Sequence, residues 1–166
     1  MSDGSLLKKQ HQRSDEVNSM EYKHILIGTD GGDLMGPVYE HCAYLAQLTD
    51  ATVHVAYVLD VAGFTAYPID ASWENMYDVL LSEGKEIVAN AQKELATRGV
   101  EGERVVTEVL DGHPAEELDA YAESHGVNLI IIGSHGRKGL DRLLIGSVAD
   151  KIIRGAKVPV LVVRSQ

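Results

Sequence analysis

The stretch Asn128–Val148, NLIIIGSHGRKGLDRLLIGSV, decides how the rest of the chain is interpreted. Its apolar start, residues 129–132, is short and rich in β-branched side chains, which is typical of a buried strand in a parallel sheet. A glycine-containing loop follows, and from Gly146 the apolar residues return at helical spacing. The stretch therefore predicts a strand, a loop and a helix in succession.

Glycines recur in this loop at a fixed spacing: Gly133, two residues, Gly136, nine residues, Gly146, and then Ser147. Glycine lets backbone N–H groups approach an anion with no Cβ in the way. A helix that starts near Gly146 adds unpaired N–H donors and the positive end of its dipole. The loop also carries the cationic side chains Arg137, Lys138 and Arg142. Together these features predict a phosphate cradle; the alternative is a glycine-rich connection that binds nothing.

This spacing resembles the nucleotide-binding signature of the universal stress protein family, and the similarity extends from about Lys23 to Arg164. The resemblance implies a regulatory module that binds ATP, with Mg²⁺ or Mn²⁺ held through the phosphates. The chain differs from the family pattern at Gly28, where proline or valine is usual, and at Gly32, where serine is common. The loop and the resemblance together assign these residues to ATP: Gly28, Asp30, Val58, Gly133, Ser134, His135, Gly136, Arg137, Gly139, Gly146, Ser147 and Val148.

Asp30 and Val58 belong to the nucleoside end of this site. A carboxylate repels phosphate, so Asp30 suits a ribose hydroxyl or a base amino group. In the family an aspartate at this place contacts the nucleoside, and the residue matching Val58 gives its backbone to adenine. The alternatives are a turn residue at the end of a strand for Asp30 and an ordinary buried strand residue for Val58.

Strand and helix patterns alternate along the whole chain. The sequence predicts strands at 24–29, 52–59, 104–110, 129–132 and 158–163, and helices at 34–48, 73–98, 114–126 and from 147 onward. This alternation predicts an α/β fold, a single doubly wound domain with a five-stranded parallel sheet and helices on both faces. The strand order 3-2-1-4-5 brings the ends of the first and fourth strands to the switch point, where such sheets bind ligands.

Smaller features complete this picture. Residues 1–21 have no hydrophobic period and predict a disordered arm, so the domain spans 22–166. Residues 61–71 predict a long flap over the site. Asp33 and Ser72 are candidate N-caps of the first two helices. The apolar positions of the second helix predict a core face: Trp73, Met76, Tyr77, Leu80, Ile87, Val88, Ala91 and Leu95.

Composition excludes several classes of function. The net charge of −10 argues against general affinity for nucleic acid or anionic membranes. Cys42 is the only cysteine, so the chain forms no internal disulfide, and its apolar setting predicts a core residue. No apolar run has the length of a membrane span or a signal peptide, so the cytoplasm is the expected compartment. The histidines lack the spacing of metal ligands.

Two further readings compete with the binding module. An ATP hydrolase or phosphotransferase would need groups that position the attacking nucleophile, and no such motif is recognisable; at most, slow hydrolysis is expected. The second is a phosphoacceptor switch of the response-regulator receiver type, in which Asp30, Asp111 and Ser134 would end their strands. Against it, Arg164 stands where receivers place a lysine, and the acidic pair after the first strand is missing. The family resemblance also implies a homodimer through 158–163, which would cover an apolar sheet edge.

Overall fold

The computed structural model describes residues 21–60, 71–135 and 145–164. Most of the predicted arm and flap, and the loop residues 136–144, lie outside these ranges, so the arm and the flap remain predictions. The strands are β1 (His24–Gly28), β2 (Thr52–Leu59), β3 (Val105–Asp111), β4 (Leu129–Gly133) and β5 (Val160–Val163). The helices are α2 (Gly36–Thr49), α3 (Ala71–Ala96), α4 (Pro114–Ser124) and α5 (Ser147–Gly155), with short 3₁₀ turns η1 (Asp33–Met35) and η3 (Gly102–Arg104).

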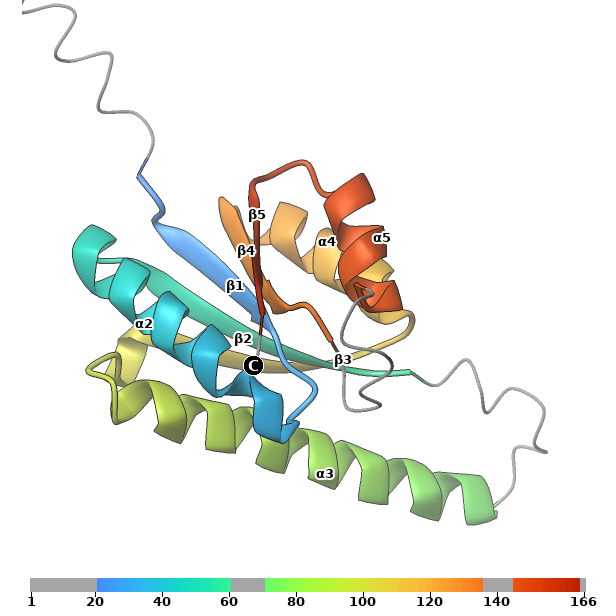
Figure 1. The fold of residues 1–166 in the computed structure, drawn as a ribbon. Coiled ribbons are helices and arrows are strands. Elements are labelled where there is room, and N and C mark those ends of the chain that lie inside the picture. Colours follow the sequence, from blue (N-terminus) through green and yellow to red (C-terminus); the bar gives the residue numbers. More distant parts are fainter. Residues whose placement is uncertain (1–20, 61–70, 136–144, 165–166) are drawn as a thin grey trace, which may run out of the picture.

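All five strands are parallel and follow the order β3-β2-β1-β4-β5 (Figure 1), which confirms the predicted topology. Gly28, at the end of β1, pairs with Ala56 of β2 on one side and with Ile132 of β4 on the other. The chain leaves β1 toward α2 and leaves β4 toward α5, and these two helices cover opposite faces of the sheet. The switch point therefore lies between the carboxyl ends of β1 and β4.

Each face of the sheet has its own apolar core. Ile25 and Ile27 of β1 pack with α2 and α3, whereas Leu26 packs with α4 and α5. These three side chains are fully buried. Because both faces are covered, the central strands are apolar at consecutive positions and not at alternate ones. Cys42 is buried in the core beneath α2, as predicted, and burial raises the pKa of its thiol to about 12.

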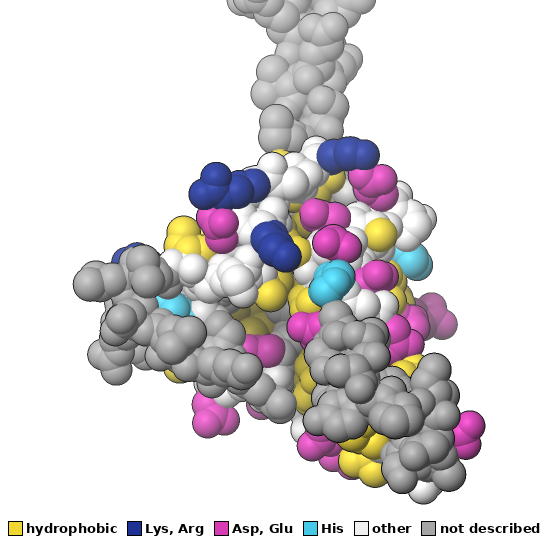
Figure 2. All heavy atoms as spheres, turned by 90° about the vertical axis from the view of Figure 1, so that its right-hand side faces the viewer, with side chains coloured by type: hydrophobic (Ala, Val, Ile, Leu, Met, Phe, Trp, Pro, Cys, Tyr) yellow, Lys and Arg dark blue, Asp and Glu magenta, His cyan; other side chains and the backbone are white. Residues whose placement is uncertain are grey.

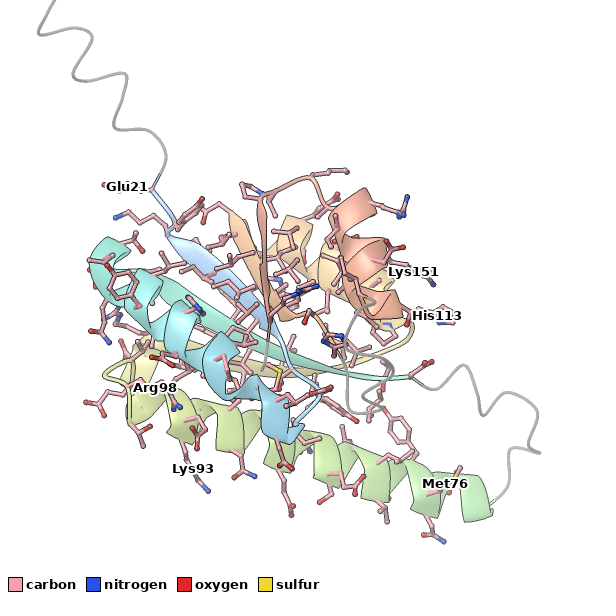
Figure 3. All side chains as sticks on the ribbon, viewed as in Figure 1. Glu21, Met76, Lys93, Arg98, His113 and Lys151 are labelled. Atoms are coloured by element: carbon pink, nitrogen blue, oxygen red, sulfur yellow. The ribbon has the colours of Figure 1, made fainter. Side chains whose placement is uncertain are left out.

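Helix α3 covers the sheet only with its second half. Val88, Ala91 and Leu95 are buried, but Val79 is 62% exposed and Met76 is only partly covered. Figures 1 and 3 show the amino-terminal end of α3, with Met76, extending past the sheet. The predicted core face is therefore confirmed at Val88, Ala91 and Leu95, whereas its members Met76, Tyr77, Leu80 and Ile87 are only partly buried.

Tyr77 makes a polar contact between the first half of α3 and the sheet. Its hydroxyl donates a hydrogen bond to Oδ2 of Asp111, at the end of β3, over 2.7 Å. This hydrogen bond raises the pKa of Tyr77, because the neighbouring carboxylate disfavours a phenolate.

Both predicted N-caps are wrong. Asp33 lies inside η1. Helix α2 begins at Gly36, and its N-cap residue is Met35, whose side chain makes no capping hydrogen bond. Ser72 lies inside α3, because that helix already begins at Ala71. Pro37 lies in the first turn of α2 and Pro114 at the start of α4, where a helix tolerates proline. Among the described residues, no helix is long and apolar enough to cross a lipid bilayer.

Three histidines and a tyrosine form a polar cluster between the sheet and α4. Nδ1 of His24 lies 3.2 Å from Nε2 of His54, whose Nδ1 lies 3.0 Å from the hydroxyl of Tyr121. The ring of Tyr121 stacks on that of His125, with centroids 3.8 Å apart. Burial, with added repulsion from His24 and His125, lowers the pKa of His54 to about 4 from its ordinary value of 6.5.

This depressed pKa predicts a pH-dependent stability. The unfolded chain binds a proton at His54 more readily than the folded one, so the contribution of this group is complete above pH 6.5 and is lost as the pH falls toward 4. Between about pH 7 and about pH 5, we expect the wild type to lose about 1–2 kcal/mol more unfolding free energy than His54→Gln. Urea unfolding at both pH values measures this difference. His41→Gln, which changes an exposed histidine on α2, should behave like the wild type; equal losses in the wild type and His54→Gln would contradict the assignment.

Candidate functional site

A cavity of about 190 Å³ opens at the carboxyl ends of the strands, at the switch point. Every residue assigned to ATP from the sequence that the structure describes lines it. Gly136, Arg137 and Gly139 lie outside the described residues. The lining residues are Gly28, Thr29, Asp30, Met35, Ala56, Tyr57, Val58, Pro114, Leu118, Ile132, Gly133, Ser134, His135, Gly146, Ser147, Val148 and Ala149. The structure therefore brings together residues about a hundred positions apart in the chain.

The turn after β1 is fixed by its own polar groups. The backbone N–H of Gly32 donates to Oδ1 of Asp30 over 2.9 Å, and that of Gly31 donates to the hydroxyl of Thr29 over 3.1 Å. Asp30 thus acts as the strand-end turn residue considered above. It also lines the cavity, and the hydrogen bonds that the structure describes use only its Oδ1.

The base of the glycine loop is closed by two backbone hydrogen bonds. The N–H of Gly146 donates to the carbonyl of Ser134 over 2.8 Å, and the N–H of Ser134 donates to the carbonyl of Val163 over 2.9 Å. The loop therefore leaves and re-enters the fold at the same point. The N–H of Gly146 is thus paired within the protein, and its place at the start of α5 is as predicted.

The next N–H groups along the chain are the candidate anion donors of this cavity. Gly146 is the N-cap of α5, and its carbonyl accepts the N–H of Asp150 over 2.9 Å as the first helical bond. The N–H groups of Ser147, Val148 and Ala149 precede that bond, and all three residues line the cavity. The positive end of the helix dipole thus faces the cavity. None of the described lining residues is Lys or Arg, so backbone groups supply the positive potential that this part of the chain offers.

Ser134 and His135 form a polar pair beside this helix end. The Ser134 hydroxyl lies 2.8 Å from Nδ1 of His135, and Ser134 is 2% exposed. Nε2 of His135 is buried and has no hydrogen-bond partner among the described residues. When the hydroxyl donates to Nδ1, the ring proton lies on Nε2, which is then a buried donor. An unpaired buried donor is costly, and a ligand acceptor would remove that cost.

The other end of the cavity is apolar. Val58 of β2 and Ile132 of β4 contribute its floor, and Pro114 and Leu118 of α4 contribute its wall. Pro114 and Leu118 were not predicted as site residues, because their spacing on the helix is equally typical of a core face. One signal could have located them: a helix that follows a parallel strand begins at the same edge of the sheet as the ligand site.

Acidic side chains are spread over the face that carries the carboxyl ends of the strands (Figure 2). Asp60 lies 4.0 Å from the ring of His113 at the start of α4, and Glu116 and Glu117 follow in the first turn of that helix. Within the described ranges, no group of three or more His, Cys, Asp or Glu residues is arranged to hold a metal ion.

The fold and the cavity define a doubly wound α/β domain in which the amino end of α5 lines a cavity at the switch point. The universal stress protein family model matches residues 21–164, and the chain belongs to this family. It is 40% identical over 143 residues to universal stress protein MJ0531 of Methanocaldococcus jannaschii, covering 86% of this chain and 82% of the relative.

Solved structures of similar proteins share the fold. Protein MJ0577 of Methanocaldococcus jannaschii superposes with a TM-score of 0.77 at 31% identity, over 89% of this chain and 99% of that one. A universal stress protein from Archaeoglobus fulgidus in complex with dAMP superposes with a TM-score of 0.65 at 25% identity, over 86% and 98%. At least one protein with this fold thus binds an adenine nucleotide.

The turn that presents Asp30 depends on the glycine at position 31. Its φ is +69°, and an added Cβ would lie 2.8 Å from Cγ1 of Ile87 on α3. Gly31→Ala is therefore expected to lower the free energy of unfolding by about 1–3 kcal/mol. Gly36→Ala is a matched control, because Gly36 is helical and a Cβ there meets open space. This control should gain about 0.4–1 kcal/mol. Urea unfolding of both variants tests the pair, and equal effects would refute the steric account.

Proposed function

We propose that this protein is an ATP-binding regulatory module, in which the bound nucleotide is the signal that other components read. The phosphates would lie at the amino end of α5, the base would occupy the apolar end near Val58, and Asp30 would accept a hydrogen bond from the ribose or the base. Mg²⁺ or Mn²⁺ would accompany the phosphates. The cytoplasm is the compartment that we expect for such a module.

The observation that carries this proposal is the polarity of the cavity. One end offers the N–H groups of Ser147 and Val148, which precede the first helical hydrogen bond, and Nε2 of His135, which has no hydrogen-bond partner among the described residues. These groups together favour an anion. The other end offers apolar walls around Val58 and Leu118, which favour a flat aromatic group. A nucleotide has both parts in one molecule. The dAMP complex of the Archaeoglobus fulgidus relative adds support from outside the chain.

Slow hydrolysis of ATP is the alternative within the same site. Ser134 and His135 lie beside the proposed phosphate position, but the Ser134 hydroxyl is 2% exposed and already paired with the imidazole. General base catalysis requires a group within reach of the attacking water. Asp30 and His135 are the described lining residues whose side chains could accept a proton from such a water.

The direct test is to denature freshly purified protein and to identify any released nucleotide by chromatography and mass spectrometry. We expect ATP close to one equivalent per chain. Release of ADP alone would favour hydrolysis. No released nucleotide, together with no uptake of added ATP and Mg²⁺, would refute the proposal and leave the loop as a scaffold.

Gly146→Val tests the position of the phosphates. The φ of Gly146 is −61°, a value that valine adopts without strain, so the fold should survive. The new side chain would enter the cavity beside Ser147, and we expect ATP affinity to fall at least about tenfold, as measured by calorimetry. Gly36→Val places the same side chain in open space outside this cavity and should retain affinity. Undiminished binding by Gly146→Val would exclude the amino end of α5 as the phosphate site.

A homodimer through β5 is part of the same proposal. This strand lies at an edge of the sheet, and Val160, Leu161 and Val162 are partly exposed. The carbonyls of Pro159 and Val163 accept hydrogen bonds from β4. Because backbone groups of successive strand residues alternate in direction, Val160 and Val162 turn their N–H and C=O groups outward. A second β5 could pair with these groups.

Val162→Pro tests this pairing without breaking the β4–β5 ladder. Proline removes the outward N–H of residue 162, and an edge strand tolerates such a loss. Light scattering after size exclusion should give a dimer for the wild type and a monomer for Val162→Pro. Val162→Ala truncates the side chain but keeps the N–H, so it should remain dimeric. A monomeric wild type, or a dimeric proline variant, would exclude pairing at this position.

A further inference from the structure

Leu118 packs directly onto the backbone of β1. The side chain is 3% exposed and lines the cavity. A Cβ added to Gly28 would lie 2.8 Å from Cδ1 of Leu118, which is closer than two carbon atoms approach without repulsion. An added Cβ at position 28 would therefore displace the end of the Leu118 side chain, and the two residues form a fitted pair.

This pair closes the apolar end of the cavity. Gly28 lies between Ala56 of β2 and Ile132 of β4 in the sheet, so Leu118 rests on the middle of the floor. Pro114 stands one helical turn earlier on the same face of α4 and lines the cavity beside it. Because the candidate anion donors belong to α5 and these apolar lining residues belong to α4, a nucleotide bound through its phosphates would direct its base toward Leu118.

We propose that Leu118, seated on Gly28, is a specificity-determining residue that limits the size of the base this cavity accepts. The inference rests on the proposed binding of adenine nucleotides. The edge of adenine remote from the ribose, with C2 and the 6-amino group, enters deepest and meets the Leu118 side chain. An unsubstituted purine fits, whereas a purine enlarged at either of these positions is rejected. Hydrophobic walls discriminate by size in this way, because each excess group must displace packed atoms.

The test compares ATP with two enlarged probes, N6-benzyl-ATP and 2-methylthio-ATP, by calorimetry on the full chain. Leu118→Ala is expected to lower the ratio of the probe Kd to the ATP Kd by about tenfold or more for at least one probe. Leu118→Val should lower it by less. Ile152→Val is the matched control, because Ile152 belongs to the same core but does not line the cavity, and its ratio should equal that of the wild type.

Gly28→Ala gives a reciprocal test of the same contact. The added Cβ displaces Leu118 toward the ligand, so ATP affinity should fall about tenfold. In the Leu118→Ala background the same glycine substitution meets no leucine and should change affinity little, which is the signature of two coupled residues. Thermal unfolding without nucleotide shows which variants fold. If Leu118→Ala does not fold, the affinities of Leu118→Val and of the double variant test the proposal.

The outcomes separate the two proposals. If the wild type binds ATP but the ratios stay the same in every folded Leu118 variant, Leu118 does not set the size limit, and nucleotide binding stands. If the effects of Gly28→Ala and Leu118→Ala on ATP affinity are additive in the double variant, the contact between these two residues does not determine which bases are accepted. If the wild type binds neither ATP nor the probes, both proposals fall.

Discussion

The structure depends on one constraint: the chain must leave β1 and β4, which are neighbours, toward opposite faces of the sheet. Because the two connections turn to opposite faces, neither covers the carboxyl ends of β1 and β4, and a crevice remains between them. The side chains and backbone groups that end both strands therefore face an opening. Asp30 lies in the turn after β1 and Ser134 directly follows β4, and all other parts of the site are arranged around these two positions.

Much of this arrangement could be predicted because it depends on local patterns. Buried parallel strands have continuous apolar runs, and the alternation of strands with helices leaves few topologies, so the strand order followed from the sequence. The glycine spacing identified the loop and the start of α5. Family resemblance added Gly28, Asp30 and Val58, whose assembly in one cavity depends on the order of the strands.

The remainder could not be predicted because it depends on contacts between distant residues. The pairing of the Gly146 N–H with Ser134 joins the two ends of a loop, and no local pattern records it. The helical stripe of α3 gave no sign that its first half passes beyond the sheet. Leu118 has the spacing of a core residue, and only the closeness of Gly28 reveals its place at the cavity. The caps were wrong because 3₁₀ turns and helix starts differ by one or two residues with little cost.

The first half of α3 has a consequence for the dynamics of the chain. A helix is held mainly by the packing of its apolar face, and the turns around Met76 and Val79 lack the buried contacts that secure the turns around Val88 and Leu95. Their amide hydrogens should therefore exchange with solvent through local fraying, well before the sheet opens. The hydrogen bond from Tyr77 to Asp111 opposes this fraying, so ionising or removing that phenol would loosen several turns while the two apolar cores stay intact. One helix thus has two levels of stability.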